Sequence, residues 1–329
     1  MADYLYWVLN TLLMICAITS LVMWVRLVPN ICRAGVRDFA DSWVPAKQRE
    51  RPFWGISEVF IMFGSMIVAG QLLLLFATEK GWYKSPEAGV AFTEQTPDML
   101  LVVITISSLA NCISIGLVLL WMWNIERGNI QKFGLSYDGA MVRLGLKSAL
   151  MVLPPVLAIS AAVSLLVTAY EHQVLDVLEQ LRSPLVFAVI FVGTAIVTPI
   201  SEEILFRGLI QGGLQRFADR FVPEFGSCGG DAGKSSLATD LITDDASDGQ
   251  SASLYKFQGG IWKPVAYWPV FAASFIFALM HYGQGAAPIP LFFLSVGLGY
   301  LYRQTGSLIP CIVVHMVLNS TTLLATFLG

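Results

Sequence analysis

Eight runs of mainly apolar residues alternate with polar segments along the 329-residue chain, and each run has at least 18 residues. An α-helix needs roughly 20 such residues to cross a bilayer. The pattern therefore predicts an all-α fold, a polytopic integral membrane helix bundle with about eight transmembrane helices. The predicted helices lie near residues 4–28, 53–78, 99–124, 141–170, 184–217, 266–284, 288–305 and 307–328.

The fifth run is too long for one straight span. Pro199 lies inside it and cannot donate the backbone hydrogen bond of a regular helix. We expect a kink near Pro199 and a new helical stretch that starts there.

Composition supports a membrane protein and excludes several other classes. Hydrophobic residues make up 56% of the chain and charged residues 13%, against about 25% charged in a soluble domain. The net charge of −3 and the lack of a basic face exclude nucleic acid as a partner. Five irregularly spaced cysteines without a CxxC pair indicate neither a disulfide framework nor a thiolate metal site.

The distribution of Lys and Arg predicts the orientation. Alternate connecting segments carry 17 of these residues on one side of the predicted bundle and three on the other. Lys and Arg concentrate on the cytoplasmic side of membrane proteins. We therefore expect the basic loops in the cytoplasm, both termini outside, and a location in the plasma (inner) membrane.

Two regions are expected. Residues 1–183 form an N-terminal four-helix membrane region without a recognisable motif, and residues 184–329 form a second membrane region that carries the candidate chemistry. Within the second region, 222–265 is a polar insert rich in Gly, Ser and Asp. Its composition supplies too little apolar surface for a core and predicts disorder, with a mobile lid as the alternative.

Ionisable residues inside a membrane span are costly and are functional candidates by default. The fifth run contains Glu202, Glu203 and Arg207. Glu203 and Arg207 are four residues apart on one helical face, which favours an ion pair that locks helices together. Glu202 points about 100° away and has no such partner, and a carboxylate in a medium of low dielectric suits a general base.

Two of the three histidines also lie in apolar runs. Phe277 precedes His281 by one turn in the sixth run, and His315 precedes Asn319 by one turn in the eighth. A lone histidine in a membrane helix often only bonds neighbouring helices. Here, however, two histidines, an amide and an unpaired carboxylate lie about midway along three helices, which favours one shared site. His172 is assigned no role.

This set of side chains suits hydrolysis by an activated water molecule. Glu202 with a histidine can deprotonate water, and a second histidine with Asn319 can stabilise an oxyanion. In a variant, Glu202, His281 and His315 hold a divalent metal such as zinc, although HExxH is absent. Cys311 could be a thiol nucleophile, but a packed structural cysteine is the simpler interpretation.

The three motifs resemble those of the CAAX-protease and bacteriocin-processing family of intramembrane endopeptidases, also called the Abi family. The family pattern is EExxxR, FxxxH and HxxxN on successive helices. The chain has these motifs in this order, starting at Glu202, Phe277 and His315, within a similarity that covers about 184–328.

The resemblance implies an intramembrane protease in which Glu202 and His281 activate water. His315 and Asn319 would then stabilise the oxyanion, and Glu203 and Arg207 would have supporting roles. The family is often described as metallopeptidases, and a water molecule activated by glutamate without a metal is the other mechanism described for it. Eukaryotic members remove the last three residues of prenylated CAAX proteins, whereas others are linked to bacteriocin maturation or self-immunity.

The expected partners are a peptide or protein substrate, which the family's substrates suggest could be lipidated, and the membrane lipids. We expect the active-site cavity to open toward the cytoplasm. The alternative is a non-catalytic membrane protein, such as an immunity factor, a scaffold or a proton-coupled carrier, in which the same polar network only stabilises helix contacts.

Overall fold

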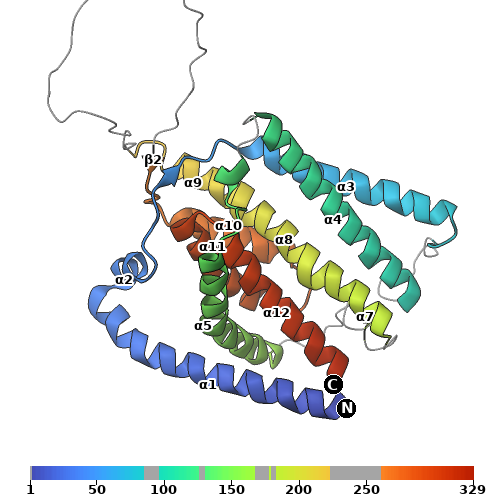
Figure 1. Ribbon diagram of the computed structural model, residues 1–329, viewed down its shortest axis with the longest axis horizontal. Helices are drawn as coiled ribbons and strands as arrows, with labels where there is room; N and C mark the ends of the chain where they lie inside the picture. Colours follow the sequence, from blue (N-terminus) through green and yellow to red (C-terminus); the bar gives the residue numbers. More distant parts are fainter. Residues whose placement is uncertain (1, 85–95, 126–129, 167–177, 179–182, 223–260) are drawn as a thin grey trace, which may run out of the picture.

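The computed structural model is a bundle of long helices, and each of the eight predicted apolar runs contains a helix (Figure 1). The structure describes residues 2–84, 96–125, 130–166, 178, 183–222 and 261–329. Its first half contains α1 (Ala2–Ala34), α2 (Val36–Trp43), β1 (Arg49–Glu50), α3 (Ile56–Glu79), α4 (Pro97–Ile125), η2 (Ile130–Phe133) and α5 (Gly139–Ser164). Its second half contains α7 (Pro184–Ile190), η3 (Phe191–Val197), α8 (Thr198–Glu203), η4 (Ile204–Gln211), α9 (Gly212–Ala218), β2 (Ile261–Trp262), α10 (Trp268–Met280), α11 (Pro288–Thr305) and α12 (Ile309–Leu328).

The length and hydropathy of the helices confirm the all-α membrane bundle. Within the described residues, six helices are long and apolar enough to cross a bilayer: α1, α3, α4, α5, the continuous helix from α7 to α9, and α12. The other two predicted spans are α10, which has only 13 residues, and α11, which ends in three consecutive polar residues.

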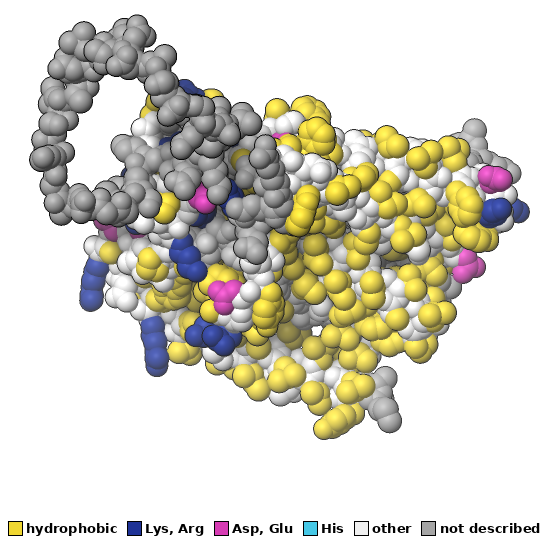
Figure 2. Space-filling view, turned by 45° about the horizontal axis from the view of Figure 1, so that its top comes forward, with side chains coloured by type: hydrophobic (Ala, Val, Ile, Leu, Met, Phe, Trp, Pro, Cys, Tyr) yellow, Lys and Arg dark blue, Asp and Glu magenta, His cyan; other side chains and the backbone are white. Residues whose placement is uncertain are grey.

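The core lies between the C-terminal helices and their neighbours. α5 packs on α12, α10 packs on α11, and α3 packs on α4 at the edge of the bundle. Phe277, Leu298 and Val314 are fully buried at the centre of the main hydrophobic cluster. Many apolar side chains remain on the outside, where Figure 2 shows them covering most of the surface away from the charged end. This surface is the one that lipid would contact.

The four segments that the sequence assigns to the basic side meet at one end of the bundle. Lys132 Nζ lies 2.6 Å from Glu50 Oε2, Arg49 Nη1 donates to the carbonyl of Tyr302, and the N–H of Leu308 donates to the carbonyl of Gly134. Both termini lie at the opposite end (Figure 1). These contacts join segments that the sequence assigns to the same side, and the orientation of the bundle in the membrane stays a prediction.

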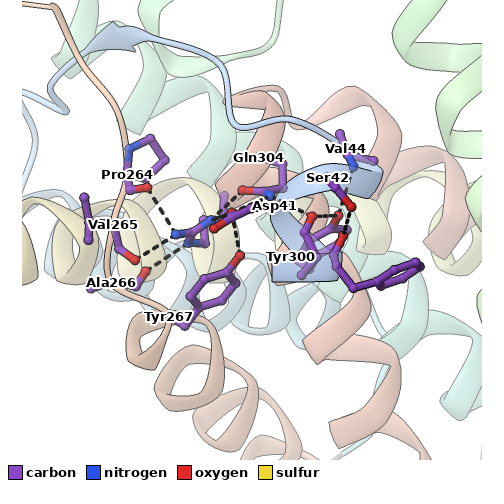
Figure 3. A network of polar contacts seen from close by, with 12 residues as sticks. Asp41, Ser42, Val44, Pro264, Val265, Ala266, Tyr267, Tyr300 and Gln304 are labelled. Carbon is purple, nitrogen blue, oxygen red and sulfur yellow. Dashed lines mark hydrogen bonds and ion pairs between the residues drawn. The ribbon is translucent and has the colours of Figure 1, made fainter. Parts of the chain in front are cut away.

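A network centred on Arg303 joins α2 and α11 to the segment before α10 (Figure 3). Arg303 is buried, and its guanidinium lies 3.3 Å from the Asp41 carboxylate and 3.6 Å from the centre of the Tyr267 ring. The Tyr267 hydroxyl donates to Asp41 at 2.7 Å. Arg303 also donates to Gln304 Oε1 and to three consecutive carbonyl groups, those of Pro264, Val265 and Ala266.

These contacts order the end of the predicted polar insert. Of the insert 222–265, residues 223–260 lie outside the described part of the chain. Residues 261–262, however, form β2, which pairs antiparallel with β1, and the carbonyl groups of the next residues bond Arg303. The carbonyl groups of Pro264 and Val265, at the end of the insert, thus bond Arg303 on α11, and the disorder expected for the rest of the insert stays a prediction.

Candidate active site

One long helix, from α7 to α9, positions the two glutamates. Its backbone changes to π-helical geometry in η3, directly before Pro199, and again in η4, directly after Glu203. The N–H of Thr198 donates to the carbonyl of Gly193, five residues earlier. The wider π turn takes the place of the kink expected at Pro199. Such turns inside α-helices are frequent at functional sites.

Glu203 lies in the protein interior and has two partners. Its Oε2 atom lies 3.1 Å from Arg207 Nε, so the spacing correctly predicts this ion pair. Its Oε1 atom lies 2.8 Å from Nδ1 of His315. The side chains of Glu203 and Arg207 are fully buried. Two partners in a low-dielectric interior hold this carboxylate in one position, where it ties α12 to the helix that carries the glutamates.

Phe277 packs its ring between the charged groups. The ring centre lies 4.7 Å from the Arg207 guanidinium, 4.7 Å from the His281 ring and 6.1 Å from the His315 ring. Arg207 also donates to the hydroxyl of Ser295 on α11 at 3.0 Å. Phe277 therefore fixes the positions of both histidines relative to the buried ion pair.

Glu202 faces the two histidines. Its carboxylate lies 4.0 Å from Nε2 of His281 and 3.6 Å from Nε2 of His315. Its side chain is 23% exposed, against 0% for Glu203. The structure thus brings the unpaired carboxylate and both predicted histidines together, from three helices. Both distances exceed a direct hydrogen bond and would fit a bridging water molecule.

The hydrogen bonds at Nδ1 orient both imidazole rings. Nδ1 of His281 lies 2.8 Å from the carbonyl oxygen of Phe277, and a carbonyl can only accept. Nδ1 of His281 is therefore the donor, and in the neutral ring Nε2 keeps its lone pair toward Glu202. His315 has the same arrangement, with Glu203 as the acceptor.

A cavity of about 520 Å³ opens beside Glu202, His281 and His315. Its other walls come from α4, α5, η3, the start of α11 and the second half of α12. The lining parts of α4, α5 and α12 lie toward the end of the bundle that carries the termini (Figure 1). The lining residues do not define the side on which the cavity opens, so its opening toward the cytoplasm stays a prediction.

Asn319 also lines the cavity, one turn beyond His315. One N–H of its amide donates to the carbonyl of Thr194 at 2.9 Å, which fixes the side chain, and its second N–H stays available. The sequence motif did not reveal Thr194, which lies on η3.

The contribution of the N-terminal helices was missed at the sequence level. α4 supplies Ser107 and Ser108 to the cavity, and α5 supplies Ser160. Asn111 on α4 also accepts a hydrogen bond of 3.1 Å from Ser201, the neighbour of Glu202. In the sequence, these residues appear only as a few hydroxyl and amide side chains inside apolar runs. Such side chains are too common in membrane helices to identify a site.

The other candidate groups are placed as follows. Cys311 is fully buried, and its thiol contacts the carbonyl of Leu298 at 3.2 Å, as expected of a structural cysteine. His172 lies outside the described residues. No group of three or more His, Cys, Asp or Glu within the described part is placed to hold a metal ion. Glu202, His281 and His315 have suitable donor atoms for zinc, but their arrangement does not form such a group.

Comparison with known proteins identifies the part of the chain that carries this geometry. Residues 184–321 match the sequence model of a family described as type II CAAX prenyl endopeptidase Rce1-like. This segment belongs to the CAAX-protease family. All three motifs and every glutamate and histidine of the candidate site lie in the matched segment. The chain has no significant match among curated proteins or solved structures.

Proposed function

We propose that the protein is an intramembrane endopeptidase that hydrolyses a peptide bond with a water molecule activated by Glu202 and His281. The observation that carries the proposal is the position of the Glu202 carboxylate, opposite the Nε2 atoms of two histidines beside a cavity. Membership of the CAAX-protease family supports processing near the C-terminus of a prenylated protein, and bacteriocin-type peptides are the second substrate class.

The proposed chemistry assigns a role to each group. Glu202, assisted by His281, takes a proton from the water, and the resulting hydroxide attacks the carbonyl carbon of the peptide bond. His315 with Nε2 protonated, together with the free N–H of Asn319, donates to the oxyanion. The carbon–nitrogen bond then breaks, and Glu202 or His281 returns the proton to the leaving amine.

Glu203 and Arg207 act through His315. Glu203 accepts the Nδ1 hydrogen bond and so stabilises the imidazolium form that can donate from Nε2. Arg207 compensates the buried charge of Glu203.

A metal-dependent form of the proposal uses the same side chains. In it, Glu202, His281 and His315 would hold a divalent ion such as zinc, and the ion would lower the pKa of the bound water. Metal analysis of the purified protein distinguishes the two forms. If the protein contains stoichiometric metal and a chelator removes both the metal and the activity, the metal-dependent form is supported. If the metal-free protein is fully active, a water molecule activated by Glu202 and His281 alone is supported.

Substitution of the acid–base groups tests the function. We expect Glu202→Gln and His281→Ala each to lower the rate of peptide cleavage by about 10²–10⁴-fold, the usual contribution of general acid–base catalysis. The measurement is release of the C-terminal tripeptide from a farnesylated CAAX peptide by the purified chain in liposomes.

Glu79→Gln, at the exposed end of α3, is the matched control and should retain wild-type activity. Equal thermal unfolding midpoints would show that all variants are folded. Wild-type cleavage by Glu202→Gln would contradict the proposal. If no peptide is cleaved by any form, the non-catalytic alternatives, an immunity factor, a scaffold or a proton-coupled carrier, would replace it.

We further propose that the protein lies in the plasma (inner) membrane with its basic end in the cytoplasm and both termini outside. The asymmetry of Lys and Arg supports this orientation.

A further inference from the structure

Two walls of the cavity come from helices outside the segment that matches the protease family. α4 and α5 lie before residue 184, where the match begins. Each places serine hydroxyl groups in the cavity that Glu202 lines: Ser107 and Ser108 from α4, and Ser160 from α5. Ser107 is exposed at the edge of the cavity and Ser160 is partly buried.

The hydroxyl groups on these helices differ in their hydrogen bonds. Ser108 donates to the carbonyl of Ile104, Thr105 to that of Leu101, and Ser164 to that of Ser160, each one turn earlier in the same helix. By contrast, the hydroxyl groups of Ser107 and Ser160 have no hydrogen-bond partner within the described part of the chain. Both can therefore donate to and accept from a molecule in the cavity.

A peptide substrate needs such partners at this depth. An extended segment brings unpaired backbone N–H and C=O groups into the cavity, and leaving one of them unsatisfied in an apolar medium costs several kcal/mol. The rest of the α4 and α5 lining consists of Ile104, Val156 and Leu157, which cannot bond a backbone.

We propose that Ser107 and Ser160 are substrate-positioning residues, which hydrogen-bond the peptide backbone of the substrate and hold it against Glu202. The inference rests on the proposed protease function and extends it to a part of the chain that the family match does not cover. Ser160, the more buried of the two, has the larger effect.

The test compares steady-state kinetics of the full-length chain in liposomes with a farnesylated CAAX peptide. Ser160→Ala and Ser107→Ala should raise KM by about threefold to tenfold, the value of one hydrogen bond, with kcat changed less than twofold. Ser160→Thr, which keeps the hydroxyl, should restore most of the affinity. Thr105→Ala and Ser164→Ala are the matched controls and should retain the wild-type KM, since these hydroxyls bond their own helices.

A second substrate locates the bond. Replacing one backbone amide of the peptide by an ester removes an N–H donor. At one position of the peptide, we expect this replacement to raise the KM of the wild-type protein. The same replacement should leave the KM of Ser160→Ala unchanged, because the hydrogen bond is already lost in this variant. If the wild-type protein is active and Glu202→Gln is inactive, but Ser107→Ala and Ser160→Ala keep the KM of the wild type, this inference is overturned and the proposed function stands. A wild type that cleaves no peptide would overturn the proposed function and this inference with it.

Discussion

Glu202 and Glu203 are adjacent in the chain but have different surroundings. Glu203 is fully buried, with an arginine on one side and a histidine on the other. Glu202 is partly exposed, faces two Nε2 atoms across more than 3.5 Å, and borders a cavity. Glu203 is enclosed by protein groups whereas Glu202 borders open space, so Glu202 is the carboxylate that a water molecule in the cavity can reach.

The buried ion pair makes a prediction about stability. Arg207→Met removes the counter-charge and leaves Glu203 buried, which should lower the free energy of unfolding by about 3–5 kcal/mol. The double variant Glu203→Gln/Arg207→Met removes both charges and should recover part of this loss. Unfolding of the detergent-solubilised protein measures both values.

Arg143→Met, on the exposed face of α5, is the control and should change stability little. The contrary result is that Glu203→Gln lowers the free energy of unfolding by the same amount in the Arg207→Met background as in the wild type. The two side chains would then contribute independently, and the ion pair would not stabilise the protein.

At the residue scale, much of the candidate geometry could be predicted from the sequence. Charge inside an apolar run is rare, so Glu202, Glu203 and both histidines stood out, and helical spacing predicted the contact of Glu203 with Arg207. The contact of His315 with Glu203 joins residues 112 positions apart. No periodicity encodes such a pair, so only the packing of α12 on α8 reveals it.

The two π-helical stretches are the unusual elements of the bundle, because they flank the short helix α8 that carries both glutamates. In η4, Gly208 lies against the ring of Phe133, which is itself buried and packs edge-on against Trp54. Trp54 in turn donates to the carbonyl of Gly208 at 2.8 Å. The close approach of backbone and ring leaves no space for a side chain at position 208.

Gly208→Ala should therefore destabilise the protein. An ideal Cβ at this position would lie 2.4 Å from Cζ of Phe133, so the aromatic pair must shift. Such overpacking costs about 1–3 kcal/mol. Thermal unfolding should show a lower midpoint for this variant.

Gly213→Ala is the matched control, because its Cβ would have no atom closer than 3.9 Å. It should be neutral, or stabilising by up to about 1 kcal/mol, since alanine is the better helix former. Equal midpoints for the two variants would show that η4 and Phe133 adjust freely.

The contact of α2 with α11, which Asp41 and Arg303 form, should depend on pH. Burial alone would raise the pKa of Asp41, but hydrogen bonds from Tyr267 and Gln304 and the Arg303 charge outweigh it and lower the pKa. Ionised Asp41 therefore stabilises the fold above its unfolded pKa of about 3.9, and this contribution is lost as pH falls through the lower folded value. The side chain is 38% exposed, so the gain is below about 1 kcal/mol.

Asp41→Asn should accordingly lower the thermal midpoint at pH 7, and its difference from wild type should shrink below about pH 4. Asp38→Asn, on the exposed face of the same helix, is the control. A difference that stayed constant down to pH 3 would show that the charge of Asp41 has no part in the contact of α2 with α11.

At the element scale, the sequence predicts what depends on local pattern. All eight apolar runs contain helices, because length and hydropathy are properties of contiguous residues. The pairing of β1 with β2 was not predicted, since it joins two-residue strands more than 200 positions apart. The π turns were not predicted either, because Pro199 is compatible with a kink as well as with a wider turn.

The whole molecule has two unlike ends. Basic loops, the small sheet and the Arg303 network lie at one end, where Figure 2 shows most of the Lys and Arg side chains, and both termini lie at the other end (Figure 1). A Cβ added to Gly329 would lie 3.3 Å from the Tyr6 ring, so the two ends of the chain meet. If both ends lie on one side of the membrane, the number of crossings is even, which we state as a prediction.

Site-specific labelling tests the orientation. In a cysteine-free background, Gly329→Cys should react with a membrane-impermeant maleimide on intact cells, and Lys47→Cys only after permeabilisation. Both positions are exposed, so lack of access would reflect the membrane. Reaction of both from the same side would contradict the even number of crossings, and the reverse pattern would contradict the cytoplasmic basic end.

The packing of α1 on α12 has a consequence for biosynthesis. α1 is translated before α12, so the contacts between these two helices form only after α12 has emerged from the ribosome. His315 lies on α12, so Glu202 and Glu203 lack this histidine partner until α12 has been made. On the proposed function, a nascent chain that still lacks α12 would therefore cleave no protein beside it in the translocon.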